Sequence, residues 1–223
     1  MRLAIGRRAA VLLVAALAGS FFIDAASARA ASRSPAAAIA KWRATWQRVQ
    51  SYECTIRESE MLGSRSEDRV YRLYFVKPRS TRMDVIAGDD RGSGAVWTGG
   101  SKVRGHRGGL LKGLVLTLDL HSRLVTSLRG TTIDQANFGA LLRHFTGIKH
   151  SAIAATTDGV RTVVSQTVAD PSSDDHVTSE VTILGKNGLP VEFDQFEGTR
   201  RVESFRYSDV RLNAPIPPTT FSL

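Results

Sequence analysis

Cysteine, long apolar runs and aromatic clusters are scarce in this 223-residue chain. Its one cysteine, Cys54, cannot form an intrachain disulfide, so the fold has to be stabilised by packing. Cys54 alternates in phase with Tyr52 and Ile56, which predicts a buried, unreactive thiol. The apolar run at 9–18 is shorter than the roughly 20 residues that a membrane-spanning helix needs.

Sequence motifs for catalysis and nucleotide binding are also missing. There is no Gly-x-Ser-x-Gly nucleophile elbow. In the turn around Gly94 and Gly99, a phosphate-binding loop would need lysine where Gly100 stands, and a dinucleotide fingerprint would need glycine where Trp97 stands. We therefore expect a protein that is not an enzyme and has no cofactor.

No histidine occurs at a spacing typical of metal sites, because His106, His121, His144, His150 and His176 are scattered singly. The nearest candidate, Asp174-Asp175-His176, lies in a Pro/Ser-rich loop and is more simply a solvated turn. Other carboxylates are assigned to the polar faces of strands and to turns: Glu58, Glu60, Asp84, Asp89 and Asp90. We expect neither a catalytic carboxylate pair nor a metal site.

The first 28 residues have the three-part pattern of a secretory signal peptide. Three arginines precede the apolar run at 9–18, and Ala26-Ser27-Ala28 fits a cleavage site. The segment 17–20 resembles a lipoprotein processing box with Ser20 in place of the lipidated cysteine. We expect a periplasmic protein that is cleaved after residue 28, is not lipidated and forms one domain over 29–223.

The chain is basic, with a formal charge of +9, of which the first 28 residues contribute +2. Such a charge favours anionic partners, including membrane surfaces, lipid headgroups and acidic proteins. The basic residues are scattered and do not form a run or an aromatic-interleaved platform. We therefore expect no nucleic-acid partner.

Two segments have the apolar spacing of amphipathic helices. In 36–50, Trp42 and Trp46 recur at helical spacing after Ser34, a plausible N-cap, and Pro35. In 134–148, five apolar residues form one stripe: Phe138, Leu141, Leu142, Phe145 and Ile148. The segment 122–130 has no clear pattern and is interpreted as a partly helical lid.

The rest of the chain alternates in the manner of antiparallel strands bounded by Gly, Pro and Asp. The expected strands are 51–61, 67–78, 79–88, 94–100, 101–106, 116–120, 151–156, 160–169, 176–184, 189–197 and 200–213. About ten or eleven strands with two helices predict an α+β domain whose sheet curls or closes. The apolar residues then either fill an ordinary core, which the pattern alone favours, or leave an apolar cleft in a curved sheet.

Several sequence steps resemble the LolA/LolB-like superfamily of bacterial outer-membrane lipoprotein-sorting and carrier proteins. They are Ser51-Tyr52-Glu53-Cys54, Phe75-Val76-Lys77-Pro78 followed by Arg82-Met83, Val96-Trp97-Thr98-Gly99, and Asp209-Val210-Arg211-Leu212-Asn213 followed by Pro217 and Phe221. The resemblance implies an open antiparallel half-barrel of about eleven strands, with helices covering its concave apolar face. The unclear segment 122–130 departs from the family's lid.

The resemblance also implies a function, namely a monomeric periplasmic carrier that holds the acyl chains of a lipid or lipoprotein. The residues expected to line the cavity or its lid are Phe75, Arg82, Met83, Trp97, Leu116, Leu118, Phe138, Leu141, Leu142 and Phe145. The alternative is a regulatory or scaffold module that binds an inner- or outer-membrane protein and carries no cargo.

Overall fold

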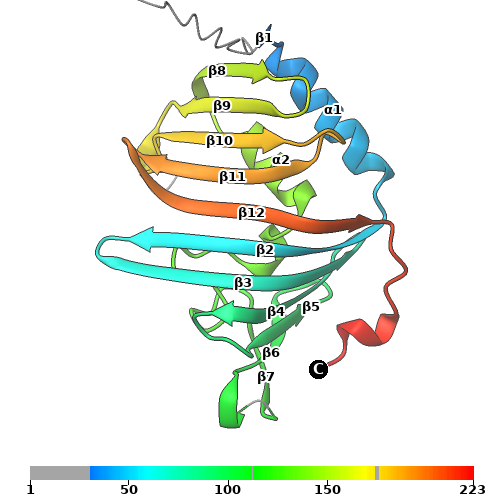
Figure 1. The fold of residues 1–223 in the computed structure, drawn as a ribbon. Helices are drawn as coiled ribbons and strands as arrows, with labels where there is room; N and C mark the ends of the chain where they lie inside the picture. The colour runs from blue at the N-terminus through cyan, green and yellow to red at the C-terminus, as the bar shows by residue number, and fades with distance from the viewer. Residues whose placement is uncertain (1–30, 112, 174–175) are drawn as a thin grey trace, which may run out of the picture.

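The computed structural model describes residues 31–111, 113–173 and 176–223. These residues form one antiparallel sheet, with two α-helices and the segment that precedes the second helix on its concave side (Figure 1). The predicted signal peptide lies outside the described residues. Within the described part of the chain, no helix is both long and apolar enough to cross a membrane.

The elements follow one another along the chain in this order. They are β1 (Ala31–Ser32), α1 (Pro35–Arg48), β2 (Ser51–Leu62), β3 (Arg65–Val76), β4 (Ser80–Gly88), β5 (Gly94–Trp97), β6 (Lys102–His106), β7 (Val115–Asp119), α2 (Phe138–Gly147), β8 (His150–Thr157), β9 (Thr162–Val168), β10 (Ser179–Leu184), β11 (Pro190–Glu197) and β12 (Arg200–Leu212). Short 3-10 turns occur at Gly109–Leu111, Ile133–Gln135, Pro171–Ser173 and Pro218–Phe221.

The strand order is β1-β8-β9-β10-β11-β12-β2-β3-β4-β5-β6-β7. Two meanders, β2 to β7 and β8 to β12, are therefore joined by the pairing of β12 with β2. β1 is only two residues long, so eleven longer strands make up the sheet. The sheet does not close, because β7 and β1 remain as separate edges. The predicted α+β class and open half-barrel are confirmed.

Alternation along β2 and β3 determines which face of the sheet is buried. Tyr52 pairs with Phe75, and Cys54 with Leu73, and all four side chains are almost completely buried. Because side chains on a strand alternate between faces, this phase places the apolar rows against the helices. Burial raises the pKa of the Cys54 thiol to about 12, as expected for an unreactive thiol.

The first helix begins where the sequence predicted. The Ser34 hydroxyl accepts a hydrogen bond from the Ala37 amide at 3.4 Å, and Pro35 occupies the first helical position. At the other end, Lys77 donates to the Trp46 carbonyl at 2.7 Å, and its ammonium lies 4.5 Å from the centre of the Trp46 ring. The helix ends at Arg48, slightly before the predicted residue 50, because the backbone of Val49 is extended.

The second helix is shorter than predicted at its amino end. The side chain of Asn137 accepts hydrogen bonds from the amides of Gly139 and Ala140, so α2 starts at Phe138. The residues before it form the separate 3-10 turn Ile133–Gln135. Phe138 stacks on Tyr52 at 4.7 Å, which attaches α2 to β2 in the centre of the sheet.

The chain between β7 and β8 crosses the whole concave face, because these strands lie toward opposite edges of the sheet. Residues 122–130 form turns in this crossing, so the partly helical conformation expected for them is wrong. Side-chain and backbone groups of the segment bond instead to a strand, since Glu60 accepts from the Ser127 hydroxyl and the Leu128 amide.

Candidate functional site

The concave face is filled on one side and open on the other. A continuous core lies between α1, α2 and the strands beneath them. Within it, the ring centres of Trp42 and Phe145 are 6.3 Å apart. Beside this core is a cleft of about 1470 Å³. Both alternatives left open by the sequence, a packed core and an apolar cleft, are therefore present in different halves of one surface.

The cleft runs between the strands and the segment that carries α2. Its sheet side includes inward-facing residues of β2 to β7, among them Ile56, Val85 and Leu118. Its other side consists of residues 123–136 and the face of α2 that carries Leu141. Alternate side chains of these strands still point toward the concave face where α2 no longer covers it, and these side chains form the apolar wall of the cleft.

Four of the ten residues predicted to contact ligand line this cleft: Met83, Leu116, Leu118 and Leu141. Four others lie in the packed core and have almost no exposed surface: Phe75, Phe138, Leu142 and Phe145. They were grouped with the cavity because an inward apolar side chain has the same sequence pattern whether or not a helix covers it.

The other two predicted residues have different partners. The Arg82 guanidinium bonds to Asp84 at 2.7 Å and to the Thr220 carbonyl at 2.9 Å, so it holds the carboxyl-terminal segment and is not part of the cleft wall. Trp97 donates from its indole to the Gly100 carbonyl at 2.9 Å and packs against a small cluster around Val103. Neither side chain lines the cleft.

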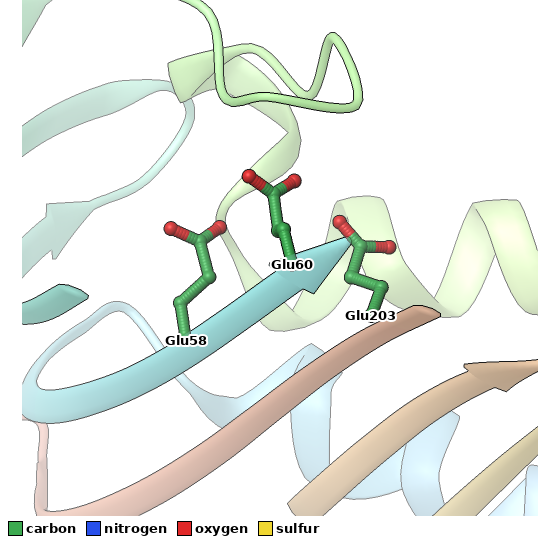
Figure 2. A group of neighbouring side chains, drawn as sticks. All are labelled: Glu58, Glu60 and Glu203. Carbon is green, nitrogen blue, oxygen red and sulfur yellow. The ribbon is translucent and has the colours of Figure 1, made fainter. Parts of the chain in front are cut away.

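Three carboxyl groups lie close together on the concave face, and two of them, those of Glu58 and Glu203, line the cleft. Glu58 and Glu60 on β2 and Glu203 on β12 each offer an oxygen atom, and these atoms lie within 4.8 Å of one another (Figure 2). All three residues are buried. The assignment of Glu58 and Glu60 to a solvated polar face was therefore wrong. They share the phase of Tyr52, Cys54 and Ile56, and this phase was the signal that could have identified them.

Glu60 binds the segment that crosses above it. Its carboxylate accepts from the Ser127 hydroxyl at 2.6 Å and from the Leu128 amide at 2.8 Å. Glu203, which lies directly opposite Glu60 in the β2–β12 register, accepts from the Thr131 hydroxyl at 3.3 Å. The carboxyl groups thus supply polar partners for a buried turn, which otherwise would lack them.

Burial and mutual repulsion change how this cluster binds protons. Burial, followed by the charge of Glu60, raises the pKa of Glu58 to about 7. The same two causes raise the pKa of Glu203 well above its ordinary value. Glu58 also accepts a hydrogen bond from the Tyr71 hydroxyl at 2.6 Å. Near neutral pH the cluster therefore retains protons, which lowers the repulsion between adjacent carboxylates.

Another buried carboxyl group, that of Glu180, lies under α2. The Nε2 atom of His144 lies 2.6 Å from a carboxyl oxygen of Glu180. The side-chain amides of Gln166 and Gln195 donate to the same carboxyl group at 2.7 and 2.8 Å. His144 and Gln195 also line the cleft. The sequence gave no indication of this arrangement because its members come from four separate elements.

The cluster of Glu58, Glu60 and Glu203 is also the only group of the described residues with enough close ligand atoms to hold a metal ion. Oxygen ligands of this type suit hard cations such as Ca²⁺ or Mg²⁺. However, both Glu60 oxygens already bind the crossing segment. The contacts in the structure therefore assign the cluster a role in holding that segment over the cleft.

Comparisons by sequence find no matching family model and no matching curated protein. Comparison by structure finds a LolA superfamily protein from Nitrosomonas europaea, 13% identical, with a TM-score of 0.43, over 86% of this chain and 98% of that one. It also finds lipoprotein LppX from Mycobacterium tuberculosis, 14% identical, TM-score 0.44, over 82% of this chain and 99% of that one.

A third similar structure is the Pseudomonas aeruginosa MucA/MucB complex, 11% identical, with a TM-score of 0.38, over 85% of this chain and 60% of that one. At these identities and TM-scores, the similarities concern the course of the chain and do not indicate its function. A LolA superfamily protein, the family that the sequence resembles, is thus among the structures similar to this chain.

Proposed function

We propose that this protein is a periplasmic carrier that holds the acyl chains of a lipid or lipoprotein in the concave cleft. The observation that carries the proposal is an apolar row that the fold leaves uncovered. Leu116 and Leu118 face the cleft from β7, and Leu116 keeps 43% of its surface exposed. An uncovered row of leucines inside a concave surface is typical of a ligand site.

The dimensions of the cleft agree with a large apolar ligand. Its volume of about 1470 Å³ exceeds the roughly 300–1,000 Å³ of sites for drug-sized molecules. Burial of one methylene group contributes about 0.8 kcal/mol, so even part of an acyl chain would bind measurably. Met83 and Leu141 complete the apolar wall on opposite sides of the cleft.

The test begins with the chain from residue 29, which retains every described element, purified without detergent. Native mass spectrometry should reveal an adduct of lipid or acylated-peptide mass, and a fluorescent fatty acid should bind to the delipidated protein. Leu116→Glu should weaken this binding at least about tenfold, because an ionised side chain would face the acyl chain.

The matched control is Ile86→Glu. Ile86 also keeps 43% of its surface exposed and also lies on a strand, but it does not line the cleft. Both variants should unfold with wild-type midpoints. Equal fatty-acid binding by the two variants, or an absence of binding by the wild type, would contradict the proposal.

The second candidate function is a module that binds a membrane-protein partner. One observation favours it: among the described residues β7 pairs only with β6, so its outer backbone groups suit the addition of a partner strand. A single stoichiometric protein recovered from membranes, in an interaction that survives delipidation, would support this function over the carrier.

A further inference from the structure

The loop between β6 and β7 exposes apolar side chains that the proposed cargo does not explain. Leu110 is fully exposed, and Leu114 keeps 54% of its surface exposed. Leu124, in the turn that follows β7, is 60% exposed. Single exposed leucines are common on protein surfaces, but three in neighbouring turns of one edge form a patch.

The loop is at one end of the molecule and beside the cleft. His106 pairs with Val115, so Leu110 and Leu114 lie in the connection of the β6–β7 hairpin, which projects at the lower end of the view in Figure 1. Leu114 and Leu124 line the cleft, whereas Leu110 does not. The apolar patch therefore continues from the cleft mouth outward onto the loop.

The base of the loop is fixed in position. The Gly108 amide donates to the Ser93 hydroxyl at 3.1 Å. A Cβ atom on Gly108 would overlap the backbone of Arg91, lying 3.1 Å from its carbonyl carbon, so this position needs glycine. The β4–β5 turn and the β6–β7 loop thus pack backbone to backbone, and the exposure of Leu110 is a property of a supported loop.

The charged groups around the patch leave it basic. Arg107 and Arg123 are exposed, line the cleft mouth and have no ion-pair partner among the described residues. The nearby carboxylates are occupied: Asp119 pairs with Lys102 at 3.6 Å, and Asp90 pairs with Arg69 at 2.8 Å. Two unpaired guanidinium groups therefore flank the exposed leucines.

We propose that this patch, formed by Leu110, Leu114, Leu124, Arg107 and Arg123, docks onto the surface of a membrane that contains anionic lipids. Leucine inserts into the acyl boundary, while arginine stays at the level of the phosphates, and both kinds of group are needed for peripheral binding. Docking at this patch would place the cleft mouth against the bilayer, where an acyl chain could pass between the two without crossing water.

Co-sedimentation with vesicles tests the proposal. The chain from residue 29 should bind vesicles of equal parts phosphatidylglycerol and phosphatidylcholine, and should bind pure phosphatidylcholine less. Leu110→Glu should reduce partitioning at least about tenfold, because it removes an inserted leucine and adds repulsion from the anionic surface. The double variant Arg107→Ala, Arg123→Ala should bind less at low salt and lose most of its salt dependence.

Val160→Glu is the matched control, since Val160 is an exposed apolar residue in the turn between β8 and β9, in the other meander. It should bind vesicles like the wild type. Equal binding by Leu110→Glu and the wild type, or equal binding to both kinds of vesicle, would overturn the proposal. A third result would also overturn it. In that case the wild type forms a dimer and does not bind vesicles, and Leu110→Glu dissociates the dimer, so that the patch joins two copies of the chain.

The docking proposal and the carrier proposal can fail separately. Because Leu110 does not line the cleft, Leu110→Glu should bind the fluorescent fatty acid with wild-type affinity. A wild-type protein that binds vesicles but no fatty acid would retain the docking surface and contradict the carrier, and the reverse result would contradict docking alone.

Discussion

Gly139, in the first turn of α2, lies directly against the indole of Trp46 on α1. A Cβ atom at this position would be 2.6 Å from Cζ2 of that ring, far inside normal contact distance. Trp46 has little freedom to move, because Phe75 packs against it at 5.5 Å and Lys77 lies over its ring. The absence of one side chain thus determines how closely the two helices approach.

Gly139→Ala should therefore destabilise the protein. Helix propensity alone favours alanine by about 1 kcal/mol, but overpacking a filled core costs about 1–3 kcal/mol, and the second effect should exceed the first. Denaturant unfolding monitored by tryptophan fluorescence measures the sum. An increase in the free energy of unfolding would show that the helices separate easily. Gly147→Ala, at the other end of α2 with nothing near its Cβ, should be stabilising or neutral.

The raised pKa of Glu58 predicts that stability falls as pH increases. Its pKa is about 7 in the folded protein and about 4.5 in an unfolded chain, so the folded state binds more protons between these values. The contribution is complete below about pH 4.5 and is lost as the pH passes 7, and by the size of the shift it amounts to roughly 3 kcal/mol.

Glu58→Gln should remove most of this dependence, because glutamine has no proton to lose. Unfolding by urea across the same pH window gives the comparison. Asp119→Asn is a suitable control. The pKa of this exposed carboxyl group is lowered, chiefly by a hydrogen bond from the His121 amide. Asp119 therefore does not titrate between pH 4.5 and 7, and its replacement should leave the slope of stability against pH in that window unchanged. Identical slopes for wild type and Glu58→Gln would mean that Glu58 is solvated.

Ser127 is expected to hold the crossing segment in place. Its hydroxyl donates to Glu60 at 2.6 Å and accepts from the Thr131 amide at 3.0 Å. Ser127→Ala deprives the Glu60 carboxylate and the Thr131 amide of their hydrogen bonds to the serine hydroxyl. The free energy of unfolding should therefore fall by about 1–2 kcal/mol. Hydrogen exchange at the Leu128 and Thr131 amides should become faster.

Ser122→Ala tests the same segment without the buried contact. Among the described residues, the Ser122 hydroxyl accepts one long hydrogen bond, from the Leu124 amide at 3.4 Å. Its removal should change stability by less than about 0.5 kcal/mol. If both serine variants behaved alike, the contact with Glu60 would not be what orders the segment.

Much of the fold could be predicted from the sequence, because period-two alternation and Gly or Asp turns indicate strands directly. The strand β2, predicted at 51–61, is observed at Ser51–Leu62. The segment 122–130 could not be predicted, since its conformation depends on Glu60, which lies 68 residues before Leu128 in the chain. A turn held by a distant carboxylate leaves no periodic pattern in its own residues.

The candidate site was less predictable than the fold. An inward apolar residue on a strand contacts either a helix or open space, and sequence does not distinguish these cases, so Phe75 and Leu116 were treated alike. Glu58 was missed for a different reason, because it was judged by its charge, whereas its phase in the strand places it inward. When a strand is long and regular, the position of a residue in the alternation should count for more than its type in predicting whether its side chain is buried.

The pairing of β2 with β12 affects how the protein assembles. These strands lie at the centre of the sheet, yet Glu60 and its partner Glu203 are separated by more than half of the chain. Contacts between residues so distant in sequence form slowly. The first meander can be synthesised long before residues 200–212 are available to complete the sheet. Until then the exposed edge of β2 would be a natural target for a chaperone.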